Sequence, residues 1–145
     1  MDGFDLNGFL PFRLNRLAAE VSERLSRLYA ERFGLDIPQW RVLATLSAAD
    51  MTTARDIVAS TRTHKSTVSR AVQQLLDRKL IARANSRADA RAYTLRLTAD
   101  GRKLFKALAP VVLAYEREVR AGMGKADAAA LDRGIAALEA ALAVT

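Results

Sequence analysis

The 145-residue sequence contains no cysteine and a single histidine, His64. Disulfides, thiolate metal sites and cysteine nucleophiles are therefore excluded, and so is a metal site built from several histidines. We find no glycine-rich phosphate loop, no carboxylate pair typical of a cleft and no nucleophile with a matching base. We therefore expect no enzyme activity, no cofactor and no metal.

Long apolar runs are also missing. No run approaches the roughly 20 residues that cross a bilayer. The first twenty residues carry charges, unlike a signal peptide; these are Asp2, Asp5, Arg13 and Arg16. We expect a cytoplasmic protein with no membrane partner, whose length suits one domain with or without helical extensions.

Negative charge is scarce in the middle of the chain. The formal net charge is +7, yet the stretch from Arg62 to Lys106 holds twelve Lys or Arg and three acids, against eleven and thirteen in the remainder. Such a patch attracts a polyanion and releases its counterions. Composition alone leaves membrane headgroups, or merely an arginine-rich surface, as alternatives.

The stretch Thr63–Lys79 predicts a helix with two distinct faces. Apolar residues recur at three- and four-residue steps: Val68, Ala71, Val72, Leu75 and Leu76. The opposite face carries donors suited to phosphates and base edges: Lys65, Ser66, Thr67, Ser69, Arg70, Gln73 and Gln74. His64, in the first turn, is a further candidate to contact DNA, although a lone surface histidine often has no role.

The flanking segments complete a winged helix-turn-helix. A short helix over 54–60 and a three-residue turn precede the basic helix. Extended segments over 80–84 and 92–97 predict a β-hairpin, the wing, whose tip spans 85–91. Arg87 and Arg91 could reach the adjoining minor groove, while Asp89 holds an arginine of the loop in place.

Longer helices are predicted at both ends of the chain. We expect helices over 9–33, 38–48, from Thr98 to about 121, and over 126–144, with a kink or break near Lys106 caused by Pro110. The first and last helices carry more apolar surface than a winged helix needs. We expect them to pair in a symmetric dimer that presents two basic helices to successive major grooves. A monomer with a larger helical core is the alternative.

The predicted fold is therefore mainly α with a small β-wing. Residues 1–35 and 99–145 form a helical dimerisation region, and residues 36–98 form the winged helix-turn-helix.

Four stretches resemble the multiple antibiotic resistance regulator (MarR) family of transcription factors, in the order and spacing that the family has. They are Ile37-Pro-Gln-Trp-Arg-Val-Leu, Lys65-Ser-Thr-Val-Ser-Arg, Asp89-Ala-Arg91 and Leu95-Arg-Leu-Thr-Ala-Asp-Gly. The resemblance covers about residues 9–142. It implies an obligate dimer that binds a pseudo-palindromic operator, usually as a repressor, and that often releases DNA when a small aromatic or anionic effector binds. It places minor-groove contact on Arg91 and support of that arginine on Asp89. It places base reading on Ser66, Thr67, Ser69, Arg70 and Gln73.

Two departures from the family pattern concern DNA binding. Lys79 stands where the family usually has glycine, so the end of the basic helix could differ. Ala90 stands where a second wing arginine is usual. Wing contacts with DNA could therefore be weaker, unless Arg87 compensates. The absence of cysteine and the single histidine argue against peroxide or metal sensing by family mechanisms.

The family's effector cleft suggests four lining residues: Phe12, Arg16, Trp40 and Phe105. Arg16 would pair with a carboxylate or phosphate. For the three aromatic residues core packing is the alternative, and for Arg16 it is a surface ion pair.

We therefore predict a dimeric, sequence-specific DNA-binding regulator. A non-specific architectural DNA-binding protein and a winged-helix module that docks an acidic protein remain alternatives.

Overall fold

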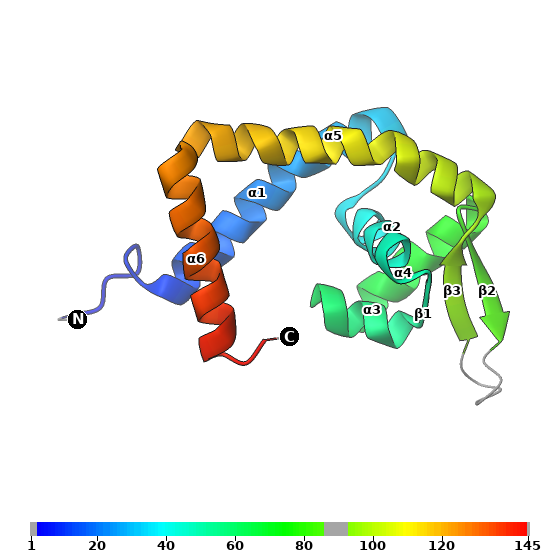
Figure 1. The fold of residues 1–145 in the computed structure, drawn as a ribbon. Coiled ribbons are helices and arrows are strands. Elements are labelled where there is room, and N and C mark those ends of the chain that lie inside the picture. Colours follow the sequence, from blue (N-terminus) through cyan, green and yellow to red (C-terminus); the bar gives the residue numbers. More distant parts are fainter. Residues whose placement is uncertain (1–2, 86–92, 145) are drawn as a thin grey trace. The chain divides into compact units, whose positions relative to one another are not determined.

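The computed structural model describes residues 3–85 and 93–144. The chain divides into two compact units, Met1–Ala109 and Pro110–Thr145. The helices and strands, labelled in Figure 1, are α1 (Leu10–Phe33), α2 (Ile37–Ala49), β1 (Met51–Thr52), α3 (Ala54–Thr61), α4 (Lys65–Asp77), β2 (Ile81–Asn85), β3 (Tyr93–Leu97), α5 (Ala99–Met123) and α6 (Lys125–Ala141). The predicted class, mainly α with a small β-wing, is confirmed.

Short side-chain caps fix where the helices of the first unit begin. At α2, the backbone N–H of Gln39 donates to the Asp36 carboxylate at 2.8 Å, and the Gln39 amide oxygen accepts from the Asp36 N–H at 3.0 Å. This reciprocal capping box satisfies two otherwise unpaired donors. At α3, the Asp56 N–H donates to Thr53 Oγ1 at 3.1 Å. Both predicted helix starts are confirmed.

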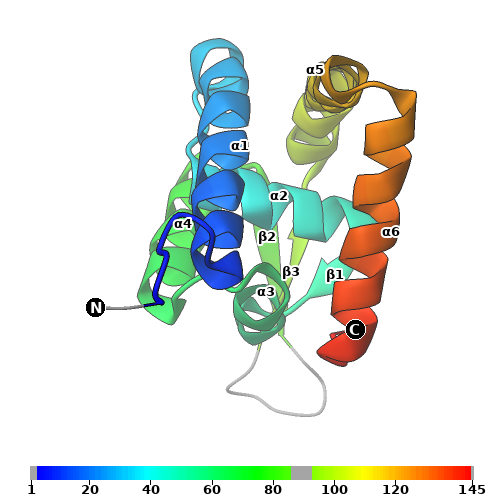
Figure 2. The same ribbon diagram turned by 90° about the vertical axis from the view of Figure 1, so that its left-hand side faces the viewer.

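The core of the first unit lies where α2, α3 and α4 pack on one another and α2 meets β3. Figure 2 shows the three helices beside the strands. The most completely buried aliphatic side chains of this core are Leu35, Val42, Leu43, Leu46, Ile57, Val68, Leu75, Leu95 and Leu108. Removal of this apolar surface from water is the main driving force for folding here.

The three strands form an antiparallel sheet in the order β1-β3-β2. Met51 pairs with Arg96 in one ladder, and Ile81 pairs with Leu97 in the other. Leu95 and Leu97 are buried and Arg96 between them is exposed, as the alternation along β3 predicts. Strand β1 was not predicted, because two residues are too few to show a periodic pattern.

A close backbone contact joins the end of α4 to the start of α5. Thr98 Oγ1 donates to the Lys79 carbonyl at 2.7 Å and accepts from the Gly101 N–H at 3.0 Å. A Cβ at Gly101 would lie 2.0 Å from the Leu80 carbonyl oxygen. Glycine is therefore required at position 101. The segment Thr98–Gly101 holds the start of α5 against the backbone of Lys79 and Leu80.

A kink or break near Lys106 was predicted from Pro110; there is no break, because Ala99–Met123 is a single helix that contains this proline. Proline removes one N–H donor. The remaining hydrogen bonds of a helix of 25 residues are sufficient to carry it through that position.

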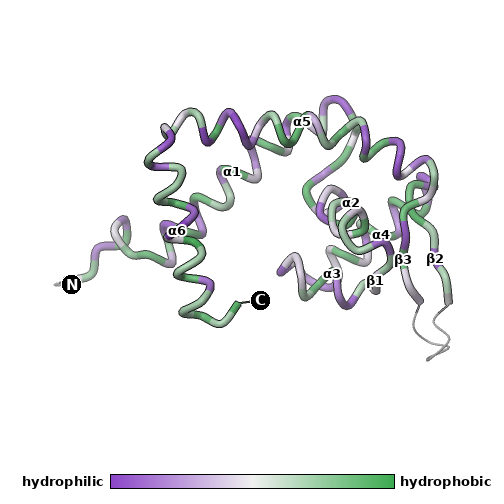
Figure 3. Tube along the Cα trace, in the orientation of Figure 1, coloured by the Kyte–Doolittle hydropathy of each residue, from purple (hydrophilic) through white to green (hydrophobic). Residues whose placement is uncertain are grey.

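The unit Pro110–Thr145 buries little of its apolar surface. Within its described residues only Ala128 is buried, at 9% exposure. Arg120 bridges α5 and α6 through ion pairs to Glu116 at 3.2 Å and Asp132 at 2.9 Å, all three partly exposed. Figure 3 shows hydrophobic residues along much of α6.

Across the described ranges, no helix is both long enough and apolar enough to span a bilayer.

Candidate nucleic-acid interface

Helix α4 is anchored through one face and leaves the other exposed to solvent. Val68, Ala71, Val72 and Leu75 are buried, and Leu76 is half-buried. The candidate DNA-contacting residues lie on the opposite face: His64, Lys65, Ser66, Ser69, Arg70, Gln73 and Gln74 are exposed, and Thr67 is half-buried. The predicted division of this helix into an inner and an outer face is confirmed.

The turn before α4 is held by polar contacts rather than by apolar packing. Arg62 adopts a left-handed conformation (φ +53°), which lets α3 end sharply. From α2, Arg41 donates to Thr63 Oγ1 at 3.2 Å. His64 then caps α4, its Nδ1 accepting from the Ser66 N–H at 3.1 Å. The first turn carries Lys65 and no acid, so its unpaired N–H groups favour an anion such as a phosphate.

Two glutamines on the outer face have intramolecular partners. The Gln73 amide donates to Asp77 at 2.9 Å and accepts from Arg83 of β2 at 3.3 Å. Gln74 accepts from the amide of Gln39 at 2.9 Å, and Gln39 is almost completely buried. Gln74 therefore satisfies a buried donor of α2, a structural role that the helical pattern did not reveal.

The predicted wing contacts fall on Arg87, Asp89 and Arg91, which lie outside the described residues. The base of the wing is described. There, the guanidinium of Arg83 lies 4.9 Å from the centre of the Tyr93 ring while it donates to Gln73. The sequence patterns did not single out Arg83, because its partners Gln73 and Tyr93 belong to other elements.

The residue that ends α4 adopts a left-handed conformation although it is a lysine and not a glycine. Lys79 has φ +59°. Its N–H donates to the Leu76 carbonyl at 2.9 Å, and the Leu80 N–H donates to the Leu75 carbonyl at 3.0 Å. This is the Schellman pattern, formed here despite the lysine side chain.

Arg78 ties the same end of α4 to the end of α1. Its guanidinium donates to the carbonyls of Phe33 and Gly34, both at 3.1 Å. These bonds satisfy carbonyls that the helix leaves unpaired, and they place a positive charge at its negative pole. Arg78 belongs to the positively charged stretch Arg62–Lys106, but its hydrogen bonds give it a structural role.

The four effector candidates form two separate groups. Trp40 stacks on Tyr29 at 5.5 Å and on Phe105 at 6.1 Å between ring centres. Arg16 lies 5.1 Å from the ring centre of Phe12 and donates to Asn7 at 2.9 Å. At 1.5 Å per residue, Arg16 is about 20 Å along α1 from Tyr29. The structure does not bring both groups to one site within one chain.

Tyr29 is the buried member of the aromatic stack. Burial raises the pKa of its hydroxyl from 10.0 to about 12; nearby Arg41 opposes the shift, and Asp36 and Glu23 add to it. In the described part of the chain, no group of three His, Cys, Asp or Glu residues could hold a metal ion.

Comparison with known proteins identifies relatives of this fold. The MarR family model matches residues 33–92. A MarR family transcriptional regulator from Silicibacter pomeroyi DSS is 34% identical, with a TM-score of 0.79 over 94% of this chain and 89% of its own. A second regulator of that family, from Silicibacter pomeroyi DSS-3, is 28% identical, with a TM-score of 0.82 over 97% and 99%.

A more distant relative shares the fold at lower identity. BpsR of Bordetella bronchiseptica, whose DNA binding is regulated by 6-hydroxynicotinic acid, is 22% identical, with a TM-score of 0.80 over 94% of this chain and 97% of its own. A comparison with curated proteins gave no match.

Members of this family are DNA-binding regulators rather than enzymes. The match at 34% identity extends over nearly the whole length of both chains, and the winged helix-turn-helix that it implies is present in the structure. The chain therefore belongs to the MarR family of transcriptional regulators.

Proposed function

We propose that this regulator is a homodimer that recognises a pseudo-palindromic operator through α4 and acts as a repressor. The observation that carries the proposal is the outer face of α4. It presents cations, hydroxyls and amides on a helix whose opposite face is buried. A rigidly seated helix can hold such groups in register with base edges and phosphates.

Arg70 and Lys65 have different roles in this proposal. Arg70 is exposed in the middle of the helix and, among the described residues, has no hydrogen-bond or ion-pair partner, so its guanidinium is free to read a guanine. Lys65 lies in the first turn and suits a phosphate. Wing contacts through Arg87 and Arg91, with Asp89 as support, complete the proposed interface.

The test is selection of bound sequences from a random duplex pool, followed by titration of the selected and a random duplex. We expect Arg70→Ala to weaken the selected duplex by about tenfold or more and the random duplex much less. Lys65→Ala should weaken both similarly and lower the salt slope by about 1. Arg117→Ala, which removes an exposed cation from the other unit, is the matched control and should change neither.

Two outcomes would replace the proposal. Equal affinity and equal salt slope on both duplexes would indicate a non-specific architectural protein. No duplex binding at low salt would indicate a module that docks an acidic protein instead.

The dimer is supported by apolar stripes that one chain leaves exposed. On α1, Leu10, Leu14 and Leu17 are 53%, 43% and 56% exposed. On α6, Leu131 and Ile135 are 41% and 47% exposed. A second copy related by two-fold symmetry would cover such faces and explain a palindromic operator. Sedimentation at micromolar concentration tests this directly.

Release of DNA by a small aromatic or anionic effector is part of the same proposal, and the ligand response of BpsR supports it. A protein that binds operator DNA in this way would act in the cytoplasm.

A further inference from the structure

One arginine at the base of the wing reaches the outer face of α4. In the register of the hairpin, Arg83 of β2 pairs with Leu95 of β3. Paired residues of an antiparallel ladder lie on the same face of the sheet, and Leu95 is completely buried on that face. Arg83 therefore leaves the sheet on its core side, although the residue itself is exposed. From there its Nη2 donates to the amide oxygen of Gln73 at 3.3 Å.

A second partner holds the other end of the same amide. The Nε2 of Gln73 donates to the carboxylate of Asp77, one turn further along α4, at 2.9 Å. A carboxylate only accepts hydrogen bonds, and a guanidinium only donates them. If the amide turned over, its oxygen would face Asp77 and its nitrogen would face Arg83, so both contacts would be lost. The two partners therefore fix which end of the Gln73 amide points in which direction.

Asp77 stands where helix electrostatics disfavour an acid. It is the last residue of α4 and lies beside the negative pole of the helix. It is also the single acid in the sequence of α4, on a helix that we propose to bind a polyanion. Its carboxylate favours neither the helix end nor DNA binding by charge. The hydrogen bond from Gln73 is the contact that offsets both effects.

Arg83 is itself held in place by an aromatic ring. Its guanidinium lies 4.9 Å from the centre of the Tyr93 ring. Tyr93 is two residues before Leu95 on β3, and so lies diagonally opposite Arg83 on the same face of the sheet. Stacking on a ring uses the flat face of a guanidinium and leaves N–H groups at its edge available. Arg83 therefore contacts Tyr93 and Gln73 together, and the wing hairpin sets the position of Gln73.

We propose that Arg83 is a positioning residue that determines base specificity through Gln73. With its amide held by Arg83 and Asp77, Gln73 offers one N–H and one oxygen lone pair to a base edge in a single orientation. An unsupported glutamine turns its amide over and adapts to other donor and acceptor patterns. The fixed amide therefore discriminates between base pairs more strongly. This inference rests on the proposed function and concerns the orientation of one side chain within it.

The experiment first locates the base pair that Gln73 reads. Bound sequences are selected from a random duplex pool with the parent protein and with Gln73→Ala, and we expect one position of each half-site to lose its preference. Discrimination at that position is the ratio of the dissociation constants for the second-best and the preferred base pair.

Arg83→Ala should then lower this ratio by about threefold or more, and change preferences elsewhere in the site by less than about twofold. In the Gln73→Ala background, Arg83→Ala should change discrimination no further, because the amide that it orients is gone. Arg83→Lys keeps the charge and a donor but not the planar group that stacks on Tyr93. Its discrimination should lie between those of the parent protein and Arg83→Ala.

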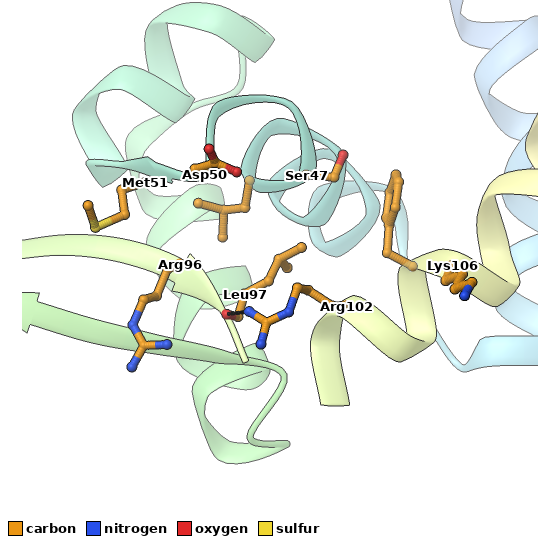
Figure 4. A pocket seen from close by; sticks show the side chains of 9 residues that line it. Ser47, Asp50, Met51, Arg96, Leu97, Arg102 and Lys106 are labelled. Atoms are coloured by element: carbon orange, nitrogen blue, oxygen red, sulfur yellow. Dashed lines mark hydrogen bonds between the residues drawn. The ribbon is translucent and has the colours of Figure 1, made fainter. Parts of the chain in front are cut away.

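Arg96→Ala is the matched control for the loss of charge. Arg96 alternates with Leu95 on the neighbouring strand, so it lies on the opposite face of the sheet from Arg83. There it lines a cleft together with Arg102 and Lys106, as Figure 4 shows. We expect Arg96→Ala to weaken all duplexes by a similar small factor and to leave discrimination unchanged.

A measurement without DNA tests whether the amide is fixed. The heteronuclear NOE of the Gln73 side-chain amide, assigned by its absence in Gln73→Ala, reports motion on the picosecond to nanosecond timescale. We expect it to fall in Arg83→Ala and in Asp77→Ala, and to stay unchanged in Arg96→Ala. Thermal unfolding checks that each variant is folded; because the substituted residues are exposed, a loss of fold is not expected.

Three results on DNA would overturn the proposal: Gln73→Ala alters no base preference, Arg83→Ala weakens every duplex equally, or Arg83→Ala changes discrimination as much without Gln73 as with it. The second result would assign Arg83 to a direct phosphate contact. An unchanged NOE in Arg83→Ala would also overturn it. Failure of the proposed function looks different, because the parent protein would then select no sequence at all.

Discussion

Between Leu35 and Leu97, most large aliphatic side chains are buried, whereas those of the helices at the two ends of the chain are largely exposed. Leu43 and Ile57 are 0% exposed, while Leu17 of α1 and Ile135 of α6 are 56% and 47% exposed. Both regions have amphipathic patterns of similar quality. The difference is that the winged helix supplies its own partners for its apolar faces, and the terminal helices do not.

This contrast separates two kinds of constraint on the sequence. In the winged helix, side-chain volume and backbone approach decide what is tolerated at the buried positions, because the apolar faces meet other elements. In the exposed stripes, a substitution matters through association with another molecule. The following predictions test this distinction, from the largest expected effect to the smallest.

Gly101→Ala should cost about 4 kcal/mol or more of unfolding free energy, because its Cβ would overlap the Leu80 carbonyl oxygen. Gly122→Ala, later in the same helix, meets nothing within 4 Å and should stabilise the protein by about 0.5–1 kcal/mol. Urea unfolding of both variants measures the difference. Similar effects at both positions would show that the backbone around Leu80 and Gly101 can shift to make room for a Cβ.

Leu43→Ala should lower the unfolding free energy by about 2–5 kcal/mol while leaving the association state unchanged, because the side chain is completely buried within one chain. Ile135→Asp should do the reverse: we expect it to weaken self-association by about thirtyfold or more. Sedimentation and urea unfolding are measured on both. A monomeric parent protein, or an Ile135→Asp variant that associates normally, would show that the terminal stripes serve another purpose.

The raised pKa of Tyr29 predicts a loss of stability at alkaline pH. Because the folded-state pKa of about 12 exceeds the unfolded value of 10.0, the contribution is complete below pH 10 and is lost as pH rises from 10 towards 12. It amounts to about 3 kcal/mol. Tyr29→Phe should therefore lose less stability than the parent protein between pH 9 and pH 11.5, as urea unfolding would measure. Parallel pH profiles would rule out this role.

Lys79→Gly should stabilise the protein by about 1 kcal/mol, since it relieves the left-handed conformation at the end of α4. Lys79→Ala is the control, because it removes the charge and retains the Cβ; it should have little effect on stability. The midpoints of thermal unfolding distinguish the two. Equal stabilisation by alanine would indicate relief of charge repulsion rather than of backbone strain.

Much of the candidate interface followed from local patterns. The spacing of Val68, Ala71 and Val72 predicted which face of α4 is buried, and local residue patterns predicted helices over 38–48 and 54–60, because these signals span a few residues. Contacts between distant segments were beyond such patterns. The bond from Gln39 to Gln74 and the bonds from Arg78 to the end of α1 join positions 35 or more residues apart.

The sequence by itself determined the helical periods, the concentration of positive charge between Arg62 and Lys106 and the absence of thiol chemistry, because each depends on residue type and local spacing. The tertiary structure decided how those charges divide. It holds Arg78 on backbone carbonyls, Arg83 beside Gln73, and Arg102 in a cleft with Lys106, while Arg70 stays free on the outer face. Residues far apart in sequence share a site only when packing of the apolar faces brings their elements together, and a one-dimensional pattern does not contain that information.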